Sequence, residues 1–334
     1  MPLNTRAVER IAAVAMATST NAASLRALGL ARTFNRPEPV TSRIRIMDLP
    51  SIEIRSLATH QELNACVELQ QATWGEGFSD VVPAAILKVA QRIGGVVVGA
   101  FDQAGTLVGF VFGLTGVEKG KIVHWSDMLA VRPEARNLGL GRRLKEHQRQ
   151  LVREIGASVI YWTYDPLIAR NAHLNFNRLG VRVAEYVEDM YGITDSVLHG
   201  GVPTDRLVVA WPTHDDEIDE RLAESHRARE SGDCQQAPVV TPDWITGAAG
   251  AAILPHCVRV EIPANAEVLF AKGPAEAAIW RRRARCGLQW GFANGYTIAA
   301  FSMPEGEGHA DGADHGFYLM TKPSRPSGGG QAMR

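Results

Sequence analysis

Cysteine is sparse in this sequence of 334 residues, and its four cysteines stand far apart, at Cys66, Cys234, Cys257 and Cys286. They form no C-x-x-C pair, which argues against a zinc ribbon and against the disulfide framework of a small secreted domain. No run of about 18 apolar residues occurs, so the sequence predicts no transmembrane helix and no membrane partner. We therefore expect reduced thiols in a cytoplasmic protein.

An excess of charge of one sign is also lacking. The formal net charge is −1 and the isoelectric point is about 6.8, so no basic field predicts a nucleic-acid partner. Apolar residues make up 46% and charged residues 21% of the chain, a balance typical of globular proteins that can fill a core. The length predicts roughly one to three domains.

Acidic residues are scarce at residues 1–48, where Glu9, Glu38 and Asp48 are the only ones among many Arg, Ala, Ser and Thr. No continuous apolar region of a secretory signal is present, although the composition is compatible with an organellar presequence. We expect a disordered arm or a start-site artefact, because Met47 precedes the first strand pattern. Residues 323–334 are expected to form a disordered tail.

Hydrophobic periodicity predicts alternating strands and helices over residues 49–213. The expected strands cover residues 52–57, 95–101, 107–114, 122–131, 158–164, 182–191 and 207–211. The expected helices cover residues 60–74, 83–93, the segment after Gly141, and 170–179.

The strongest motif lies where the strand at 122–131 passes into the next helix. A turn at 132–135 and the segment Arg136-Asn137-Leu138-Gly139-Leu140-Gly141 separate them. The first amides of a helix have no intrahelical acceptor, and glycine lets a phosphate approach them closely. A dinucleotide fingerprint would need glycine at Leu144, and a P-loop would need Lys after Gly141, where Arg142 stands. The motif predicts another kind of phosphate loop, with tight packing as the alternative.

This loop resembles the acyl-CoA loop R/Q-x-x-G-x-G/A of the GNAT N-acetyltransferase superfamily, and the expected element order is similar too. Residues from Trp162 to Gly180 also match W-T-x-D-P-L-x-x-R-N-A-x-x-N-x-x-x-L-G, the motif of a branch known as predicted GNAT superfamily acetyltransferases. The resemblance covers residues 50–213. It implies an α+β fold, with a mixed, mostly antiparallel sheet flanked by helices and a smaller C-terminal α/β lobe.

The resemblance implies acetyl-CoA or another acyl-CoA as co-substrate and no metal. In the superfamily, the loop amides hold the CoA pyrophosphate and the preceding strand pairs with the pantetheine. The CoA contacts assigned in this way are Leu129, Ala130, Val131, Arg136, Asn137, Leu138, Gly139, Leu140, Gly141, Arg142 and Asn171. The implied reaction is direct acyl transfer to an amine in a ternary complex. The acceptor is expected from Arg170 and Arg206, rather than from the resemblance, to be a small molecule such as an amino acid.

One position departs from the superfamily. Phe176 stands where many members carry the tyrosine that protonates the CoA thiolate, so a non-catalytic CoA sensor or scaffold is the alternative function. Tyr164, Tyr191 and Asp165 are candidates for the acid, although Tyr164 could be an ordinary strand aromatic and Asp165 could start a turn.

An ionisable residue interrupts the apolar strand before the loop. Asp127 is the candidate base because a charge there is costly unless it is used or paired. His124 is the second candidate, expected on the other face unless the strand is bulged. A purely structural pair is the alternative.

The acceptor site is expected near Arg170 and near Asp205 and Arg206, which follow a loop at 197–204. Arg206 could hold a substrate carboxylate, or Asp205 and Arg206 could pin the loop. We expect a small-molecule amine as partner and no nucleic acid, and a homodimer is compatible with the sequence.

Residues 214–250 are expected to form a charged linker, followed by a small α/β lobe at 251–322. Its helix carries Arg281, Arg282, Arg283 and Arg285, interpreted as a solvated face rather than a phosphate grip. His309, Asp311, Asp314 and His315 lie in a glycine-rich loop, which could bind a metal but is expected to be only polar.

Overall fold

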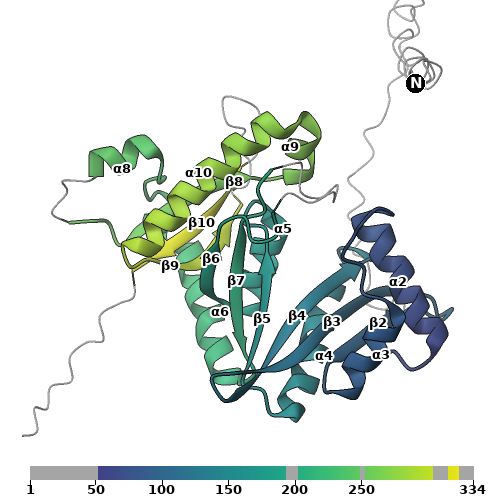
Figure 1. Ribbon diagram of the computed structural model, residues 1–334. Helices are drawn as coiled ribbons and strands as arrows, with labels where there is room; N and C mark the ends of the chain where they lie inside the picture. The colour runs from purple at the N-terminus through teal and green to yellow at the C-terminus, as the bar shows by residue number, and fades with distance from the viewer. Residues whose placement is uncertain (1–51, 193–201, 249–252, 304–314, 323–334) are drawn as a thin grey trace, which may run out of the picture. The chain divides into compact units, whose positions relative to one another are not determined.

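The structure is a computed structural model that describes residues 52–192, 202–248, 253–303 and 315–322 (Figure 1). The expectations for residues 1–48 and 323–334, for most of the loop at 197–204, and for His309, Asp311 and Asp314 lie outside the described residues. Everything below concerns the described part of the chain.

A seven-stranded sheet with the order β1-β2-β3-β4-β5-β7-β6 forms the first part of the fold. All of its neighbouring strands are antiparallel except β4 and β5, which are parallel. The strands are β1 (Glu53–Ser56), β2 (Val96–Phe101), β3 (Leu107–Glu118), β4 (Lys121–Val131), β5 (Val159–Tyr164), β6 (Arg182–Val187) and β7 (Arg206–Pro212). This mixed, mostly antiparallel sheet confirms the predicted fold class.

Helices cover both faces of this sheet. On one face α2 (His60–Trp74) and α3 (Ala84–Arg92) pack against Phe110 and Phe112, and on the other α4 (Leu140–Ile155) packs against Val98 and Val111. Because successive side chains of a strand point to opposite faces, a continuous apolar run such as that of β3 supplies both cores.

Strand β4 contains an extra residue. Phe112 of β3 pairs with Met128, whereas the next residue, Gly113, pairs with Ser126. Asp127 is therefore the extra residue of a β-bulge, a feature that re-aims side chains and is frequent beside active sites.

The strands β4 and β5 stay together only at one end. They pair at His124–Ile160 and at Trp125–Tyr161, and beyond these positions they diverge (Figure 1). We call the diverging part, residues 126–131 of β4 and 162–164 of β5, the β4–β5 wedge. The bulge at Asp127 lies at its narrow end.

The helix expected at 170–179 is present, but its turns widen. It begins as α5 (Ala169–Ala172), continues as the π-helical segment η3 (His173–Leu179), and stops at Gly180, whose φ is 65°. A π-helical turn holds more residues than an α-helical turn, so the side chains that follow are rotated around the axis. Counting positions back from Gly180 with the α-helical period therefore points to the wrong face.

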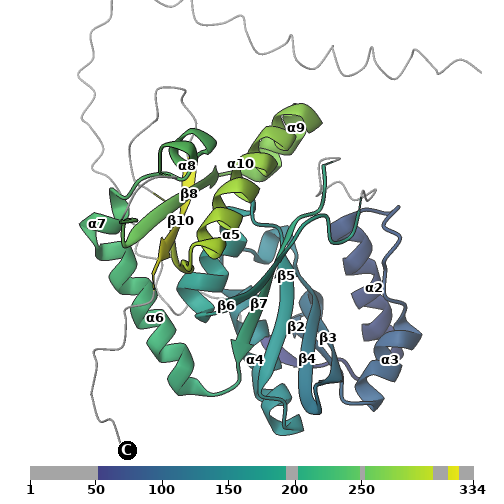
Figure 2. The ribbon, with the colours of Figure 1, turned by 60° about the vertical axis from the view of Figure 1, so that its left-hand side comes forward.

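The C-terminal part is built on a three-stranded sheet with the order β8-β10-β9. Figure 2 shows β8 and β10 of this sheet beside α10. Its strands are β8 (Cys257–Pro263), β9 (Thr297–Ser302) and β10 (His315–Thr321), and its helices are α9 (Ala266–Lys272) and α10 (Pro274–Ala293). The segment expected as a linker holds α6 (Asp215–Glu230), α7 (Gly232–Gln235) and α8 (Pro242–Ala248). Helix α6 contacts β9 and η3 and buries Ile218 and Ala228, so it is not only a solvated helix. The division into domains stays a prediction.

Helix α10 joins the two sheets through ion pairs, which corrects the expectation of a solvated arginine face. Arg281 is only 2% exposed, and its two terminal nitrogens each lie 2.6 Å from an oxygen of Asp165, after β5. Arg285 binds Asp205, before β7, at 2.8 and 2.6 Å. Bidentate pairs of this kind fix orientation as well as distance.

Candidate functional site

The loop between β4 and α4 has the geometry of an anion site. Asn137 and Gly139 have φ of 64° and 69°, the left-handed region that lets the chain turn directly into the helix. The first backbone hydrogen bond of α4 runs from Arg143 N to Gly139 O, at 3.1 Å. The amides of Leu140, Gly141 and Arg142 therefore point out of the helix end, where the helix dipole is positive.

Apolar side chains lie beside these amides. A Cβ built on Gly141 would be in ordinary van der Waals contact with Leu129 Cδ2 at 3.8 Å and with Leu174 Cδ2 at 3.9 Å, so α4, β4 and η3 meet there. Leu129, Leu174 and Asn171 are all half-buried. The amides are suited to an anion such as a pyrophosphate, and the CoA contacts named from the resemblance stay a prediction.

A bulky side chain at Gly141 is expected to weaken CoA binding. Gly141→Val should raise the Kd for CoA about 10-fold or more, since a branched side chain would keep the ligand from the amides at the start of α4. Gly141 does not have a positive φ, so Gly141→Ala is a matched control that keeps the helix and should change the Kd much less. Isothermal calorimetry measures both, and equal affinities for the two variants would argue against a CoA contact at Gly141.

The two faces of the wedge carry different chemistry. Trp125 and its partner Tyr161 lie on the α2–α3 face, and so does Thr163, two residues further along β5. Asp127 is the bulge residue, so alternation does not place it; its interaction with Asp80, in the loop between α2 and α3, puts it on that face, across the wedge from Thr163. The Tyr191 hydroxyl lies 3.2 Å from Thr163 Oγ1, and Tyr191 is 48% exposed. The structure thus brings the candidates Asp127 and Tyr191 to the same face.

Asp127 is exposed to solvent at the bulge, yet its pKa is raised above that of an ordinary carboxyl group. The main cause is the surrounding protein, which displaces water; the Trp125 side chain offsets part of the rise by donating toward the carboxylate, and nearby Asp80 adds to it. A carboxylate with a raised pKa is a better proton acceptor, as a general base requires.

His124 does not reach the α2–α3 face, which corrects its place as a candidate base. It is fully buried under α4, with Nδ1 3.0 Å from Thr115 Oγ1 and Nε2 3.1 Å from the Gln148 amide. Burial, together with the nearby Lys145, lowers the pKa of His124 to about 4. It therefore serves as a neutral packing residue.

Tyr164 is likewise unsuited to be a proton donor to a ligand. It is 5% exposed, its hydroxyl lies 3.3 Å from that of Tyr318, and burial raises its pKa. Phe176 packs edge-on against both tyrosine rings in the core. The wide turns of η3 place Leu174, rather than Phe176, beside Gly141.

The predicted acceptor residues at the start of β7 are held in ion pairs. Asp205 is fully buried and binds Arg285, the Tyr186 hydroxyl and Asp189 N. Arg206 is 6% exposed, lies 3.8 Å from Asp165 and packs on the Tyr191 ring. Both residues therefore have partners within the protein, and the two alternatives, a carboxylate contact and pinning of the loop, stay predictions.

Arg170 points to the C-terminal part of the chain. Its guanidinium binds Glu267 at the start of α9, and both side chains are exposed. An exposed ion pair contributes little stability, so Arg170 connects two surface segments rather than forming an acceptor site.

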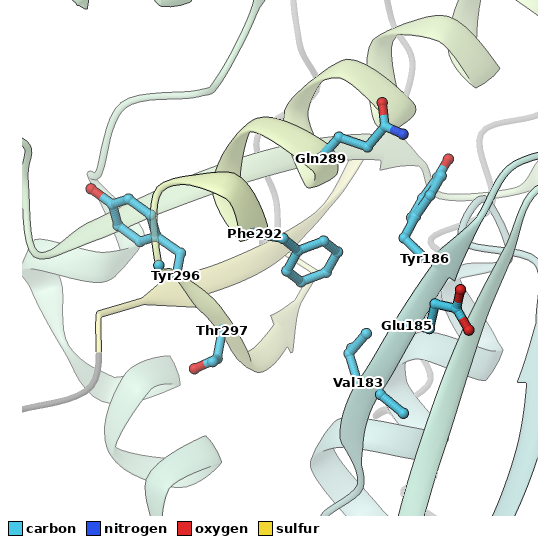
Figure 3. A pocket seen from close by; sticks show the side chains of 9 residues that line it. Val183, Glu185, Tyr186, Gln289, Phe292, Tyr296 and Thr297 are labelled. Carbon is cyan, nitrogen blue, oxygen red and sulfur yellow. The ribbon is translucent and has the colours of Figure 1, made fainter.

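A hollow of about 540 Å³ lies elsewhere, between the edge strand β6 and α10. Figure 3 shows Gln289 and Phe292 of α10 facing Val183 and Tyr186 of β6. None of its lining residues is a predicted site residue, and β7 separates β6 from β5 and the wedge. We assign no function to it.

The described residues contain neither a metal-binding cluster nor a membrane-spanning helix. Within the described ranges, no three His, Cys, Asp or Glu side chains lie close enough together to hold a metal ion. In the same ranges no helix combines the length and the apolar character needed to cross a bilayer. All four cysteines are free thiols.

Three polar residues near the wedge were not singled out from the sequence. Ser126 and Gln148 are buried beside His124, and Lys145 is only 3% exposed. The available signal was spacing, because Lys145 lies four residues after Gly141 and three before Gln148, on one helix face. Lysine is seldom buried, so a pattern reading places it in solvent.

Comparison with known proteins finds a match to one protein family. Residues 63–180 match the family described as Acetyltransferase (GNAT) family. Among solved structures, the chain is similar to yncA from Salmonella typhimurium with acetyl-CoA, at 18% identity over 49% of this chain and 95% of that chain, with a TM-score of 0.40.

Two further solved structures are similar. The ribosomal-protein-S18-alanine N-acetyltransferase from Escherichia coli has 21% identity over 49% of this chain and 96% of that chain, with a TM-score of 0.38. A chain of the NatC complex bound to Gag peptide and CoA has 13% identity over 48% of this chain and 98% of that chain, with a TM-score of 0.40. No curated protein matches the sequence. The match over residues 63–180 shows that this chain contains a domain of the GNAT acetyltransferase family.

Proposed function

We propose that this protein is an acyl-CoA-dependent N-acyltransferase that transfers a short acyl group, such as acetyl, directly to an amine. The observation that carries the proposal is the β4–β5 wedge, with an anion-binding helix end on its α4 face and an exposed carboxylate, Asp127, on its α2–α3 face. Such a wedge lets a donor and an acceptor approach one point from two sides.

The donor would lie on the α4 face. The amides of Leu140, Gly141 and Arg142 would hold the pyrophosphate, and the apolar side chains of Leu129 and Leu174 would contact the pantetheine. The thioester supplies an activated acyl group, and the protein's part is to hold and orient it.

The acceptor would lie on the α2–α3 face. An ammonium has no lone pair, so the amine must lose a proton before it can attack a carbonyl carbon. Asp127 would accept that proton, directly or through water, as the N–C bond forms and the C–S bond breaks. Tyr191, held by Thr163 across the wedge, would bound the space open to the acceptor.

The charge on this face favours a cationic small amine. Asp80 lies close enough to Asp127 to raise its pKa, so two carboxylates face the same region. Arg170 and Arg206, the basic residues expected to bind a substrate carboxylate, are in ion pairs instead. We therefore propose an amine acceptor for which a carboxylate is not required.

A thiol-release assay tests the function. Acetyl-CoA and succinyl-CoA are combined with a panel of polyamines, amino acids, amino acid amides and short peptides, and CoA binding is measured in parallel by calorimetry. We expect turnover with small cationic amines, and an amide should serve at least as well as its amino acid. CoA binding without acylation of any acceptor would favour the sensor function, and no binding at millimolar CoA would contradict both functions.

A further inference from the structure

Lys145 of α4 occupies the narrow end of the wedge. Its Nζ donates to Ser126 Oγ of β4 at 2.8 Å and lies 3.7 Å from the ring centre of Trp162 of β5. Ser126 and Trp162 directly follow the last paired residues of the two strands. The amine thus lies at the first step where β4 and β5 are no longer joined.

The helix face that carries Lys145 also carries the start of α4, where the pyrophosphate is proposed to bind. Gly141 precedes Lys145 by four residues, so the two positions lie one above the other on α4. Leu129 of β4 and Leu174 of η3 border this face at Gly141. A pantetheine chain that runs from the helix end along this face would bring its thiol to the narrow end of the wedge.

The lysine has no acidic partner among the described residues. Burial alone lowers the pKa of its ammonium well below the ordinary value, with no opposing carboxylate. The groups that face it are Ser126 and His124 on β4 and Trp162 on β5, and Gln148 on its own helix completes the surroundings. A buried cation without a counter-ion is costly, so burial makes this ammonium a stronger acid than that of an exposed lysine, and an anion beside it would relieve the cost.

The polar chain behind Lys145 does not move its proton elsewhere. Ser126 donates to Gln148 Oε1 at 2.8 Å, and the Gln148 amide contacts His124. A carboxamide donates and accepts hydrogen bonds but does not exchange protons as a hydroxyl or imidazole does. The chain therefore holds the lysine in place, and its proton faces the wedge.

We propose that Lys145 meets the sulfur of CoA and protonates it as the thioester bond breaks. This inference rests on the proposed function. As the amine nitrogen bonds to the acyl carbon, the C–S electron pair leaves on sulfur; the thiolate takes a proton from the Lys145 ammonium and departs as a thiol. The neutral lysine regains a proton from water when CoA leaves.

This assignment accounts for the missing tyrosine. Phe176 cannot donate a proton, and the Tyr164 hydroxyl is directed to Tyr318 in the core. Of the three hydrogens that an ammonium can donate, Ser126 takes one, which leaves capacity for an anion.

The first test needs no variant. Calorimetry compares CoA with desulfo-CoA, in which hydrogen replaces the thiol, and ultraviolet absorbance follows thiolate formation of bound CoA against pH. We expect CoA to bind about 10-fold or more tightly than desulfo-CoA, because a charge-assisted bond forms to the thiolate. Thiolate absorbance should appear at a lower pH than in free CoA. Equal affinities together with an unshifted thiol pKa would overturn the proposal.

Lys145→Met removes the ammonium and keeps the bulk of the side chain. It should abolish both the preference for the thiol and the shift in thiol pKa, and lower kcat about 10²-fold. Its melting temperature should not fall, because replacing a buried charge by an apolar side chain relieves a desolvation cost. Lys88→Met, at an exposed position of α3, is the matched control and should behave as wild type.

The outcomes separate this inference from the function itself. Acylation by Lys145→Met at the wild-type rate, with the thiol preference retained, would remove Lys145 and leave the acyltransferase intact. A thiol preference that depends on Lys145 without any acylation would support the sulfur contact and contradict the enzyme.

Discussion

Asp127→Asn is expected to lower kcat about 10²-fold or more at neutral pH, with little change in the Kd for acyl-CoA. The amide keeps the size of the side chain at the bulge but cannot accept the proton of the attacking amine. A steady-state assay on an acceptor found in the panel, with calorimetry for CoA, measures both quantities. Raising the pH should partly restore the variant, because more of the amine then arrives already neutral.

The pH dependence of kcat/KM for the wild-type protein tests the same assignment, that of Asp127 as the base. The pKa of Asp127 is raised, so its basic form is lost as the pH falls through a value above the ordinary carboxylate range. We therefore expect kcat/KM to fall on the acid side at this raised pKa of Asp127. Asp80→Asn removes the neighbouring charge and should move this fall to lower pH, whereas Asp102→Asn, in the hairpin turn before Thr106, should leave it in place. Near-full kcat for a folded Asp127→Asn variant would contradict the assignment.

Arg281→Ala is expected to lower the free energy of unfolding by about 3–5 kcal/mol, the usual cost of removing one partner from a buried ion pair. Asp165, which is 7% exposed in the intact protein, would keep only Arg206, at 3.8 Å, as a nearby cation. Urea unfolding followed by circular dichroism gives the change. The loss arises because an ionised carboxylate without its bidentate partner is poorly solvated in the core.

The neighbouring arginine provides the control for this prediction. Arg283 pairs with Glu261 at 3.3 Å with a side chain that is 45% exposed, so Arg283→Ala should cost less than about 1 kcal/mol. A combined Asp165→Asn and Arg281→Met variant should recover part of the loss, because it leaves no buried charge unpaired. Equal costs for Arg281→Ala and Arg283→Ala would show that the buried pair does not join α10 to the first sheet.

Local patterns were sufficient for most of the fold. The helix at 60–74 and the strands at 122–131 and 158–164 agree closely with α2, β4 and β5, because periodicity and turn residues are local properties. The predicted strand at 182–191 ends early, at Val187, and the short helices α7, α8 and α9 were not anticipated. Short helices are stabilised by packing and capping contacts, which pattern reading does not include.

In the candidate site, residues that act with their neighbours along the chain were easier to predict than residues whose partners are distant in sequence. The glycine loop could be identified from its own residues, because a phosphate loop is built from backbone amides that are contiguous in the chain. Residues whose roles depend on distant partners were misplaced: Arg206 meets Asp165, and Arg281 was expected in solvent. Nothing local distinguishes an arginine in a buried ion pair from one on the surface.

By itself, the sequence determined the fold class, the glycine loop at the start of α4 and the presence of a carboxylate at Asp127, since each depends on neighbours along the chain. Only the tertiary structure decided which face of the wedge each side chain reaches. The bulge at Asp127 and the wide turns of η3 each change the period on which such counting relies. The burial of Lys145 was also decided by the tertiary structure. Sequence pattern places a lysine in solvent, but β4 and β5 cover this one, and only the fold brings these two strands to its face of α4.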